Sequence, residues 1–256
     1  LSILEQAKYS SVVPIFKSDD KANVMNYRPI VKQCALAKIF DKILCNKLYN
    51  HVSCKISEFQ HGFLPGRSAC TNLAVLTNQI TVSMENRTQV AVIYTDFSKA
   101  FDSVNHDILL VKLQKFGITG NLLQFIKSFL TNRKLIVKIS FTFSSTITNA
   151  YSGIPQGTHI GPLLFILFIN DLPDCLQFCK PLLFADDLKS LNKWCDINKL
   201  LLNISKCCIV SYTHCYNPIL QNYSINHVLL ERVQKVKDLG VIFDYKLEFH
   251  NHINYM

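Results

Sequence analysis

Two adjacent carboxylates at the end of an apolar run constrain this chain more than any other feature. Residues 181–184 are apolar, Asp186 and Asp187 follow, and a leucine and a polar stretch come next. An apolar run, a turn and a short apolar return are typical of a tight hairpin. Two like charges at that turn repel each other, and a bound Mg²⁺ would remove the repulsion while sharing its other ligands with water and phosphate. The other interpretation is a solvated turn, because turns favour Asp.

A third carboxylate stands 90 positions earlier, at the end of another apolar stretch. Val90 to Tyr94 reads as a strand covered on at least one face, and Asp96 follows it. Open sheets place functional groups at such strand ends. If antiparallel strands bring Asp96 to Asp186 and Asp187, three carboxylates can hold two metal ions about 4 Å apart for in-line displacement at phosphorus. The pattern therefore predicts polymerase chemistry.

The remaining apolar periodicity predicts one compact α+β unit without internal repeats. We expect strands at residues 9–16, 90–94, 135–139, 142–151, 208–212 and 239–243. We expect helices at 34–52, from 68 or 71 to about 84, from 105 to 117, from 121 onward, from 162 to before 173, and at 191–202. In the first helix, three- and four-residue spacing predicts a core-facing stripe of Leu36, Ile39, Phe40, Ile43, Leu44 and Leu48.

The composition favours an intracellular protein with an anionic partner. The chain of 256 residues carries a formal charge of +9, and nucleic acid is the usual partner of such an excess; an inert basic surface is the alternative. Ten scattered cysteines without a secretory signal indicate a reduced compartment, the nucleus or cytoplasm. Leu163 to Ile169 is the longest apolar run and is too short for a bilayer, which needs about 20 residues. The chain starts at Leu1, so we interpret it as a fragment.

Five ordered motifs resemble one family of polymerases. They are NYRPI, QHGFLPGRSACTNL, YTDFSKAFDSVNHDILLVKL, SGIPQGTHIGPLLFILFINDL and FADD. The chain resembles the reverse transcriptase domain of non-LTR (LINE-like) retrotransposons, close to the jockey and CR1 groups. This resemblance implies a right-hand polymerase, α+β in class, with an antiparallel palm sheet packed on helices and no thumb. Residues 1–88 would be mainly fingers and 89–256 mainly palm.

The resemblance also implies roles for the acidic residues and one lysine. Asp96, Asp186 and Asp187 match the family's metal ligands, so two Mg²⁺ ions are expected, with Mn²⁺ as a possible substitute. Lys206 matches the lysine that protonates the leaving pyrophosphate, and Asp102 reads as structural.

Further matches concern the incoming nucleotide. Lys17 and Arg28 flank a polar turn and match residues that hold the triphosphate, which suits the planar fork of Arg; two surface cations are the alternative. Phe101 matches an aromatic steric gate that favours deoxynucleotides, although such a residue alone would read as core. Gln156 and Gly157 match a turn lining the nucleotide and template pocket. The implied partners are an RNA template, a DNA primer and deoxynucleoside triphosphates, with no membrane; the oligomeric state stays open.

Two features depart from the family pattern. Asp187 and Trp194 are only seven positions apart, an apparent internal deletion that would truncate the following helix and displace Lys206. An error of about 1 Å can reduce the rate 10²-fold. His159 and Ile160 replace two aliphatic residues, and we expect His159 near the surface. We therefore weigh an RNA-directed DNA polymerase against a degenerate, inactive remnant that at most binds nucleic acid, and against a scaffolding fragment.

Overall fold

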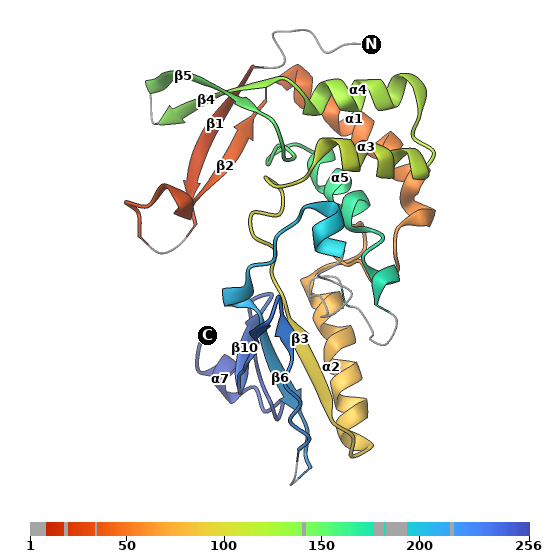
Figure 1. Ribbon diagram of the computed structural model, residues 1–256, viewed down its shortest axis with the longest axis vertical. Helices are drawn as coiled ribbons and strands as arrows, with labels where there is room; N and C mark the ends of the chain where they lie inside the picture. The colour runs from red at the N-terminus through yellow and green to blue at the C-terminus, as the bar shows by residue number, and fades with distance from the viewer. Residues whose placement is uncertain are drawn as a thin grey trace. The chain divides into compact units, whose positions relative to one another are not determined.

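The computed structural model combines helices and sheets, as the sequence predicts (Figure 1). It describes residues 9–17, 20–33, 35–139, 142–176, 182, 194–215 and 218–256. The chain forms two compact units, each built from two separate stretches. Unit 1 comprises Leu1–Ile56 and Lys99–Asn170, and unit 2 comprises Ser57–Ser98 and Asp171–Met256.

Unit 1 contains a four-stranded sheet in the order β2-β1-β4-β5. Its strands are β1 (Tyr9–Phe16), β2 (Tyr27–Lys32), β4 (Arg133–Ile139) and β5 (Thr142–Ala150). β1 and β2 form an antiparallel hairpin, β1 runs parallel to β4, and β4 pairs antiparallel with β5. Val12 and Val31 face each other across the hairpin and are both buried, so the sheet has one covered face.

The helices of unit 1 gather around α5 (Ile160–Ile169), in which every residue except Pro162 is buried. A helix that is apolar all round belongs in a core. α5 packs against α1 (Ala35–Val52) and α3 (His106–Lys115), and α3 also contacts α4 (Gly120–Leu130). Asn105 caps α3 as expected, because its side chain accepts a hydrogen bond from the Ile108 N–H.

The orientation of α1 contradicts the prediction of a core-facing stripe. Leu48 is buried, but the other end of the stripe is not: Leu36, Ile39, Phe40 and Ile43 are 52% to 79% exposed. The buried face carries Asp41, whose carboxylate accepts the N–H groups of His159 and Ile160 at 2.6 and 3.2 Å. Positions 41 and 48 lie nearly opposite positions 36 and 43 on a helix. A polar contact with the start of α5 therefore sets which side of α1 is buried.

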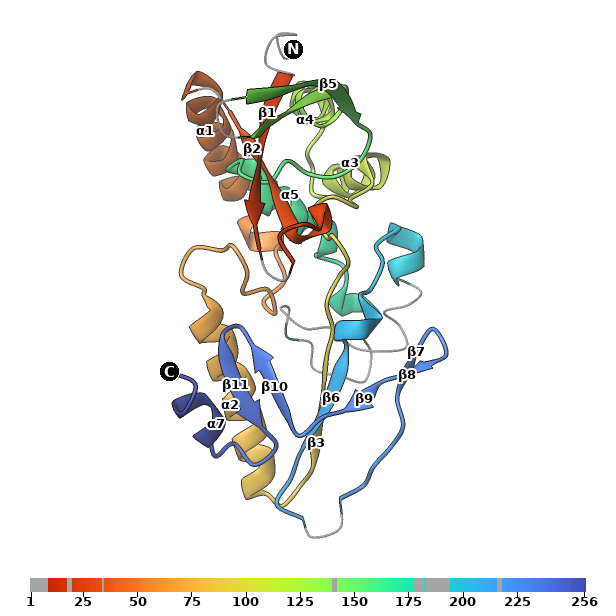
Figure 2. The same ribbon diagram turned by 90° about the vertical axis from the view of Figure 1, so that its left-hand side faces the viewer.

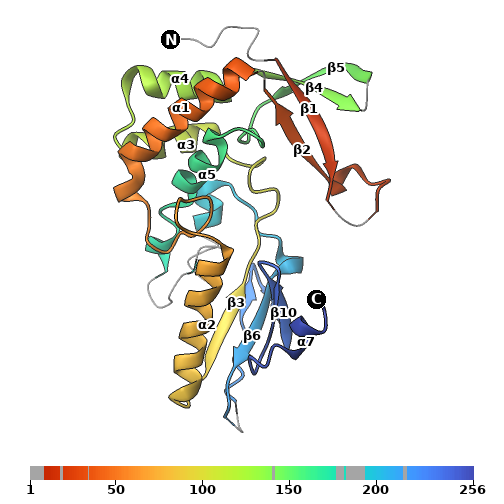
Figure 3. The same cartoon turned by 180° about the vertical axis from the view of Figure 1, so that it is seen from behind.

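Unit 2 is built on a three-stranded sheet covered by one helix. The strands are β3 (Val90–Tyr94), β6 (Cys208–Tyr212) and β9 (Glu231–Arg232), with β3 and β6 antiparallel. α2 (Ala69–Glu85) begins at the capping box of Ser68 and lies along β3 (Figure 3).

Strand alternation gives this sheet two apolar faces. One face packs with α2 in a cluster of Leu73, Leu76, Ile80, Met84, Tyr94, Val210, Tyr212 and Phe243. The other face forms a cluster of Ile93, Cys207, Ile209, Ile225 and Leu230. The prediction that residues 90–94 form a covered strand is confirmed.

Two hairpins complete unit 2 (Figure 2). β10 (Lys235–Asp238) pairs with β11 (Val241–Asp244), beside the short helix α7 (His250–Ile253), and β7 (Ser224–Ile225) pairs with β8 (Val228–Leu229). The strand expected at 239–243 begins at Val241, because Leu239 and Gly240 form the turn with φ of +46° and +94°.

Short 3₁₀ helices occupy Val24–Asn26, Ser53–Lys55, Pro173–Cys175 and Ile204–Lys206. Of the helix expected at 191–202, residues 194–198 are helical and 191–193 lie outside the described residues. In the part of the chain that is described, no helix combines the length and apolar character needed to cross a bilayer.

Candidate active site

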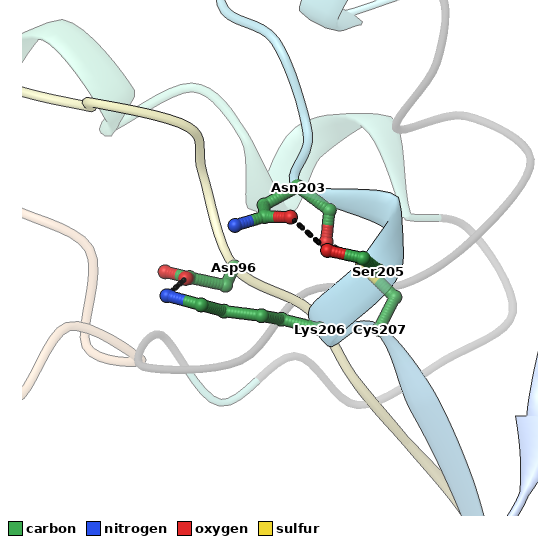
Figure 4. A network of polar contacts seen from close by, with 5 residues as sticks. All are labelled: Asp96, Asn203, Ser205, Lys206 and Cys207. Carbon is green, nitrogen blue, oxygen red and sulfur yellow. Dashed lines mark hydrogen bonds and ion pairs between the residues drawn. The ribbon is translucent and has the colours of Figure 1, made fainter. Parts of the chain in front are cut away.

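Asp96 lies just beyond β3, and its carboxylate forms an ion pair with Lys206. The Lys206 Nζ is 3.1 Å from the Asp96 Oδ2, and Figure 4 shows the extended lysine side chain beside the carboxylate. The two side chains are 52% and 49% exposed. Water screens an exposed pair, which contributes about 1 kcal/mol or less. The ion pair therefore keeps Lys206 next to Asp96 but is weak enough to break readily.

Both residues lie next to the same end of the β3–β6 ladder. In this antiparallel ladder, Tyr94 is paired with Cys208, so Asp96 follows β3 where Lys206, in the 3₁₀ turn Ile204–Lys206, precedes β6. Beyond the ladder the pairing shifts, because Phe97 bridges Leu202 and the Asn203 N–H donates to the Asp96 carbonyl at 2.7 Å. The spacing of only seven positions from Asp187 to Trp194 does not keep Lys206 away from Asp96.

The predicted carboxylate partners Asp186 and Asp187 lie outside the described residues. Within the described ranges, no group of three or more His, Cys, Asp or Glu residues is arranged to hold a metal ion. Asp96 has the donor chemistry that Mg²⁺ requires, because its half-exposed carboxylate offers hard oxygen ligands. Its Oδ1 has no hydrogen-bond or ion-pair partner among the described residues, so that oxygen is available to a cation. Asp96 thus fits as one ligand of a divalent ion.

Lys17 and Arg28 share one face of the β1–β2 hairpin, and both are exposed. Arg28 is paired with Ile15, and Lys17 follows Ile15 by two residues, so the two cations are diagonal neighbours. The Lys17 N–H donates to the Asn26 carbonyl at 2.9 Å, which extends the hairpin. The arrangement presents two positive charges side by side to solvent.

Phe101 is half-buried and held by aromatic stacking and backbone bonds. Its ring stacks on that of Phe165 with centroids 4.6 Å apart and planes 20° apart. Its carbonyl accepts the Ile154 N–H at 2.7 Å. The residue expected to act as a gate therefore has a rigid backing from α5.

Gln156 and Gly157 lie in a turn that contacts two other segments of unit 1. The Gln156 Nε2 donates to the Asp102 Oδ1 at 3.0 Å, and its carbonyl accepts the Val31 N–H at 2.8 Å. Gly157 has a φ of +98°, and a Cβ there would lie 2.9 Å from the Val31 carbonyl oxygen. Only glycine permits this approach, which connects the strand carrying Arg28 to the turn carrying Gln156.

Sequence reasoning missed the two residues that anchor this turn. The carbonyl of Gly153 accepts a hydrogen bond from the His106 Nε2 at 2.8 Å and from the Arg133 Nη2 at 3.0 Å. Both side chains are buried. Burial lowers the pKa of His106, which keeps it neutral, and lowers the pKa of Arg133 to about 10, which leaves it charged at neutral pH. No local pattern indicates this contact, because the three residues are far apart in sequence.

The structure thus groups the predicted residues by unit. Unit 1 holds Lys17, Arg28, Phe101, Gln156 and Gly157, and unit 2 holds Asp96 and Lys206. His159 is exposed, as expected.

Comparison with known families places most of the chain in one enzyme class. The family model described as "Reverse transcriptase (RNA-dependent DNA polymerase)" matches residues 17–191. The "Probable RNA-directed DNA polymerase from transposon BS" of Drosophila melanogaster is 25% identical over 97% of this chain and 31% of that protein. The "RNA-directed DNA polymerase from mobile element jockey" of the same organism is 27% identical over 96% of this chain and 30% of that protein. The chain therefore spans about a third of the length of these curated relatives.

Solved structures with a similar fold include telomerases. Apo telomerase from Candida tropicalis, truncated from its C-terminal domain, has a TM-score of 0.58 and 12% identity, over 95% of this chain and 55% of that chain. Telomerase from the same organism in complex with a TWJ fragment of telomeric RNA also has a TM-score of 0.58, with 11% identity over 98% of this chain and 46% of that one. At these identities the likeness concerns the fold alone.

Proposed function

Because the chain belongs to the reverse transcriptase family, we propose that it forms the fingers and palm of a retrotransposon polymerase that extends a DNA primer on an RNA template. The observation that carries the proposal is the position of Asp96. It follows β3, forms an ion pair with Lys206, and falls within the segment matched by the family model. A half-exposed carboxylate at a strand end is available to a cation, whereas a structural carboxylate would be enclosed by backbone donors.

We assign residues 1–88 mainly to the fingers and 89–256 mainly to the palm. The β1–β2 hairpin, which presents Lys17 and Arg28, falls in the first range. The antiparallel β3–β6 pair, which carries Asp96 and Lys206, falls in the second. In this assignment the hairpin cations bind the triphosphate of the incoming nucleotide.

Asp96, together with Asp186 and Asp187, would hold the divalent ions, for which Mg²⁺ is the proposed metal. When bound, the metal lowers the pKa of the attacking hydroxyl and stabilises the leaving oxygen. Lys206 holds a proton on Nζ next to this position and can deliver it to the leaving pyrophosphate once it releases Asp96. The exposure of the ion pair makes that release easy.

Phe101 and Gln156 would shape the nucleotide site. The stacking of Phe101 on Phe165 prevents the ring from moving aside, so a sugar with a 2′-hydroxyl would clash with it. Gln156 is oriented by Asp102, which binds the amide nitrogen and leaves the amide oxygen available. The excess positive charge suits an RNA template and DNA primer, with deoxynucleoside triphosphates as substrates.

Primer extension on an RNA template tests the proposal. We expect a Mg²⁺-dependent DNA product from the chain, and its loss in Asp96→Asn and in Asp186→Asn. Asp196→Asn is the matched control, because Asp196 is an exposed carboxylate of the same unit. Product that persists in Asp186→Asn would refute the assigned site. RNA binding without any product from the unaltered chain would instead indicate the inactive remnant.

A further inference from the structure

A pocket lies at the opposite end of β6 from Lys206. Its volume is about 660 Å³, and all its lining residues belong to unit 2. They come from β6, from β9 and from the segments after β6, β9 and β11. The polar part of the wall consists of Ser211, Thr213, His214, Cys215, Arg232, Gln234 and Lys246. A strand rises about 3.4 Å per residue, so the seven residues from Lys206 to Thr213 put the pocket on the order of 20 Å from the proposed catalytic carboxylate.

Arg232 is a fixed cation without a counter-charge in this pocket. Its guanidinium donates from Nη1 to the Ser211 Oγ and from Nη2 to the Gln221 carbonyl. A guanidinium has five N–H donors, so three have no acceptor among the described residues. The side chain is half-buried, and its nitrogens have no carboxylate within 4.0 Å in the described part of the chain. An anion would satisfy both the remaining donors and the charge.

Other polar side chains of the pocket wall also lack an acidic partner. Lys246 and His214 likewise have no carboxylate partner among the described residues, and no Asp or Glu lines the pocket. Thr213 is buried, and its hydroxyl accepts the Cys215 N–H while its own hydrogen has no acceptor in the described part of the chain. The pocket therefore offers cations without a carboxylate partner and a hydroxyl donor; the Lys246 Nζ contacts only the Tyr245 ring, 5.6 Å from its centroid, among the described residues.

The apolar part of the wall indicates the class of anion. Tyr245 lines the pocket together with Pro218, Leu220 and Val233. An aromatic ring next to cations is the arrangement with which proteins bind single-stranded nucleic acid, the base stacking on the ring and the phosphate binding the cations. A small inorganic anion would use the cations and leave this surface empty.

We propose that this pocket binds a phosphate and an adjacent base of a single-stranded RNA segment, at a second site separate from the one at Asp96. Arg232 and Lys246 bind the phosphate, and Tyr245 supports the base. Such a site would hold the RNA outside the region being copied. It requires neither a metal ion nor the carboxylates of the polymerase site.

The rate at which the Cys215 thiol is alkylated reports binding at this pocket in the unaltered chain. Its thiol is exposed and lies in the pocket wall, whereas the exposed thiols of Cys54 and Cys70 are not among the lining residues. The chain is treated with N-ethylmaleimide, with and without a single-stranded oligouridylate of about 20 nucleotides, in the absence of divalent ions. We expect the RNA to slow alkylation of Cys215 and to leave that of Cys54 and Cys70 unchanged, as measured by mass spectrometry.

Affinity measurements identify the cations responsible. Lys246→Gln and Arg232→Gln should each weaken binding of the oligouridylate about tenfold and reduce the slope of log affinity against log salt by about 0.7. Lys235→Gln is the matched control, because Lys235 is an exposed lysine of the same unit outside the pocket. Lys246→Gln keeps the test valid if Arg232→Gln does not fold, since the Lys246 side chain makes no hydrogen bond among the described residues.

Three results would overturn the proposal. They are unchanged alkylation of Cys215 at saturating RNA, equal loss of affinity in Lys246→Gln and Lys235→Gln, and full protection of Cys215 by inorganic phosphate at the same concentration of phosphate groups. Asp96→Asn should keep the protection of Cys215. Failure of this second site is thus distinguishable from failure of the polymerase proposal.

Discussion

Gly153→Ala tests how the turn that carries Gln156 is held. A Cβ at Gly153 would lie 2.7 to 2.9 Å from the O, Cα and C atoms of Asp102, all of them backbone. The turn would have to move away, which breaks the bonds from the Gly153 N–H to Val104 at 2.9 Å and from the Ile154 N–H to Phe101 at 2.7 Å. A side chain in left-handed backbone costs about 1–2 kcal/mol and each of the two lost hydrogen bonds roughly 1, so we expect a destabilisation of about 3 to 4 kcal/mol.

Gly120→Ala is the matched control in the same unit. Gly120 also has positive φ, +59°, but a Cβ there would meet nothing within 4 Å. Only the backbone strain remains, about 1–2 kcal/mol. Urea unfolding followed by far-ultraviolet circular dichroism gives both free energies of unfolding. If Gly153→Ala falls within about 0.5 kcal/mol of Gly120→Ala, the contact between the turn and residues 101–104 does not carry the assigned energy.

Two further predictions concern the buried carboxylate of Asp41 and the half-buried carboxylate of Asp238. Asp41→Ala should lower the free energy of unfolding by about 2 to 4 kcal/mol, because it leaves the N–H groups of His159, just before α5, and of Ile160, its first residue, without their acceptor. Asp41→Asn should lose less because one acceptor oxygen remains, and equal losses in urea unfolding would contradict this. Burial raises the pKa of Asp238 from 3.8 to about 6, so the folded state favours the protonated form and its stability should fall as pH rises through that range. Asp238→Asn should flatten this fall between about pH 4 and pH 7, and an unchanged pH profile of the urea midpoint would refute the assignment.

The helices and strands were predicted well because helix caps and apolar spacing involve residues that are close together in the sequence. Ser68 and Asn105 cap the helices expected of them, and the apolar residues 90–94 form a strand with two covered faces. The predicted orientation of α1 was wrong. The side of α1 that is buried depends on the contact between Asp41 and the start of α5, which are more than a hundred positions apart in the sequence. Periodicity describes one helix at a time and contains no information about such a partner.

The candidate site shows the same difference between what local patterns predict and what depends on contacts between distant residues. The motifs named Asp96 and the family resemblance named Lys206, but only the fold shows that the two meet beside the end of the β3–β6 ladder. His106 lies in a quoted motif and Arg133 in none, but the contact of both with Gly153 emerges solely from the structure. Asp186 and Asp187 lie outside the described residues, so their roles stay predictions.

The pairing of Asp96 with Lys206 also determines which changes of length the chain can tolerate. Because β3 and β6 set this pairing between them, residues can be gained or lost in the long connection from one strand to the other without altering which side chains face each other. A single residue inserted within β6 would instead shift its register against β3 and turn part of its side chains to the opposite face of the sheet, since side chains alternate along a strand. Natural variants of this domain should therefore differ freely in the number of residues before Trp194 and hardly at all between Lys206 and Tyr212.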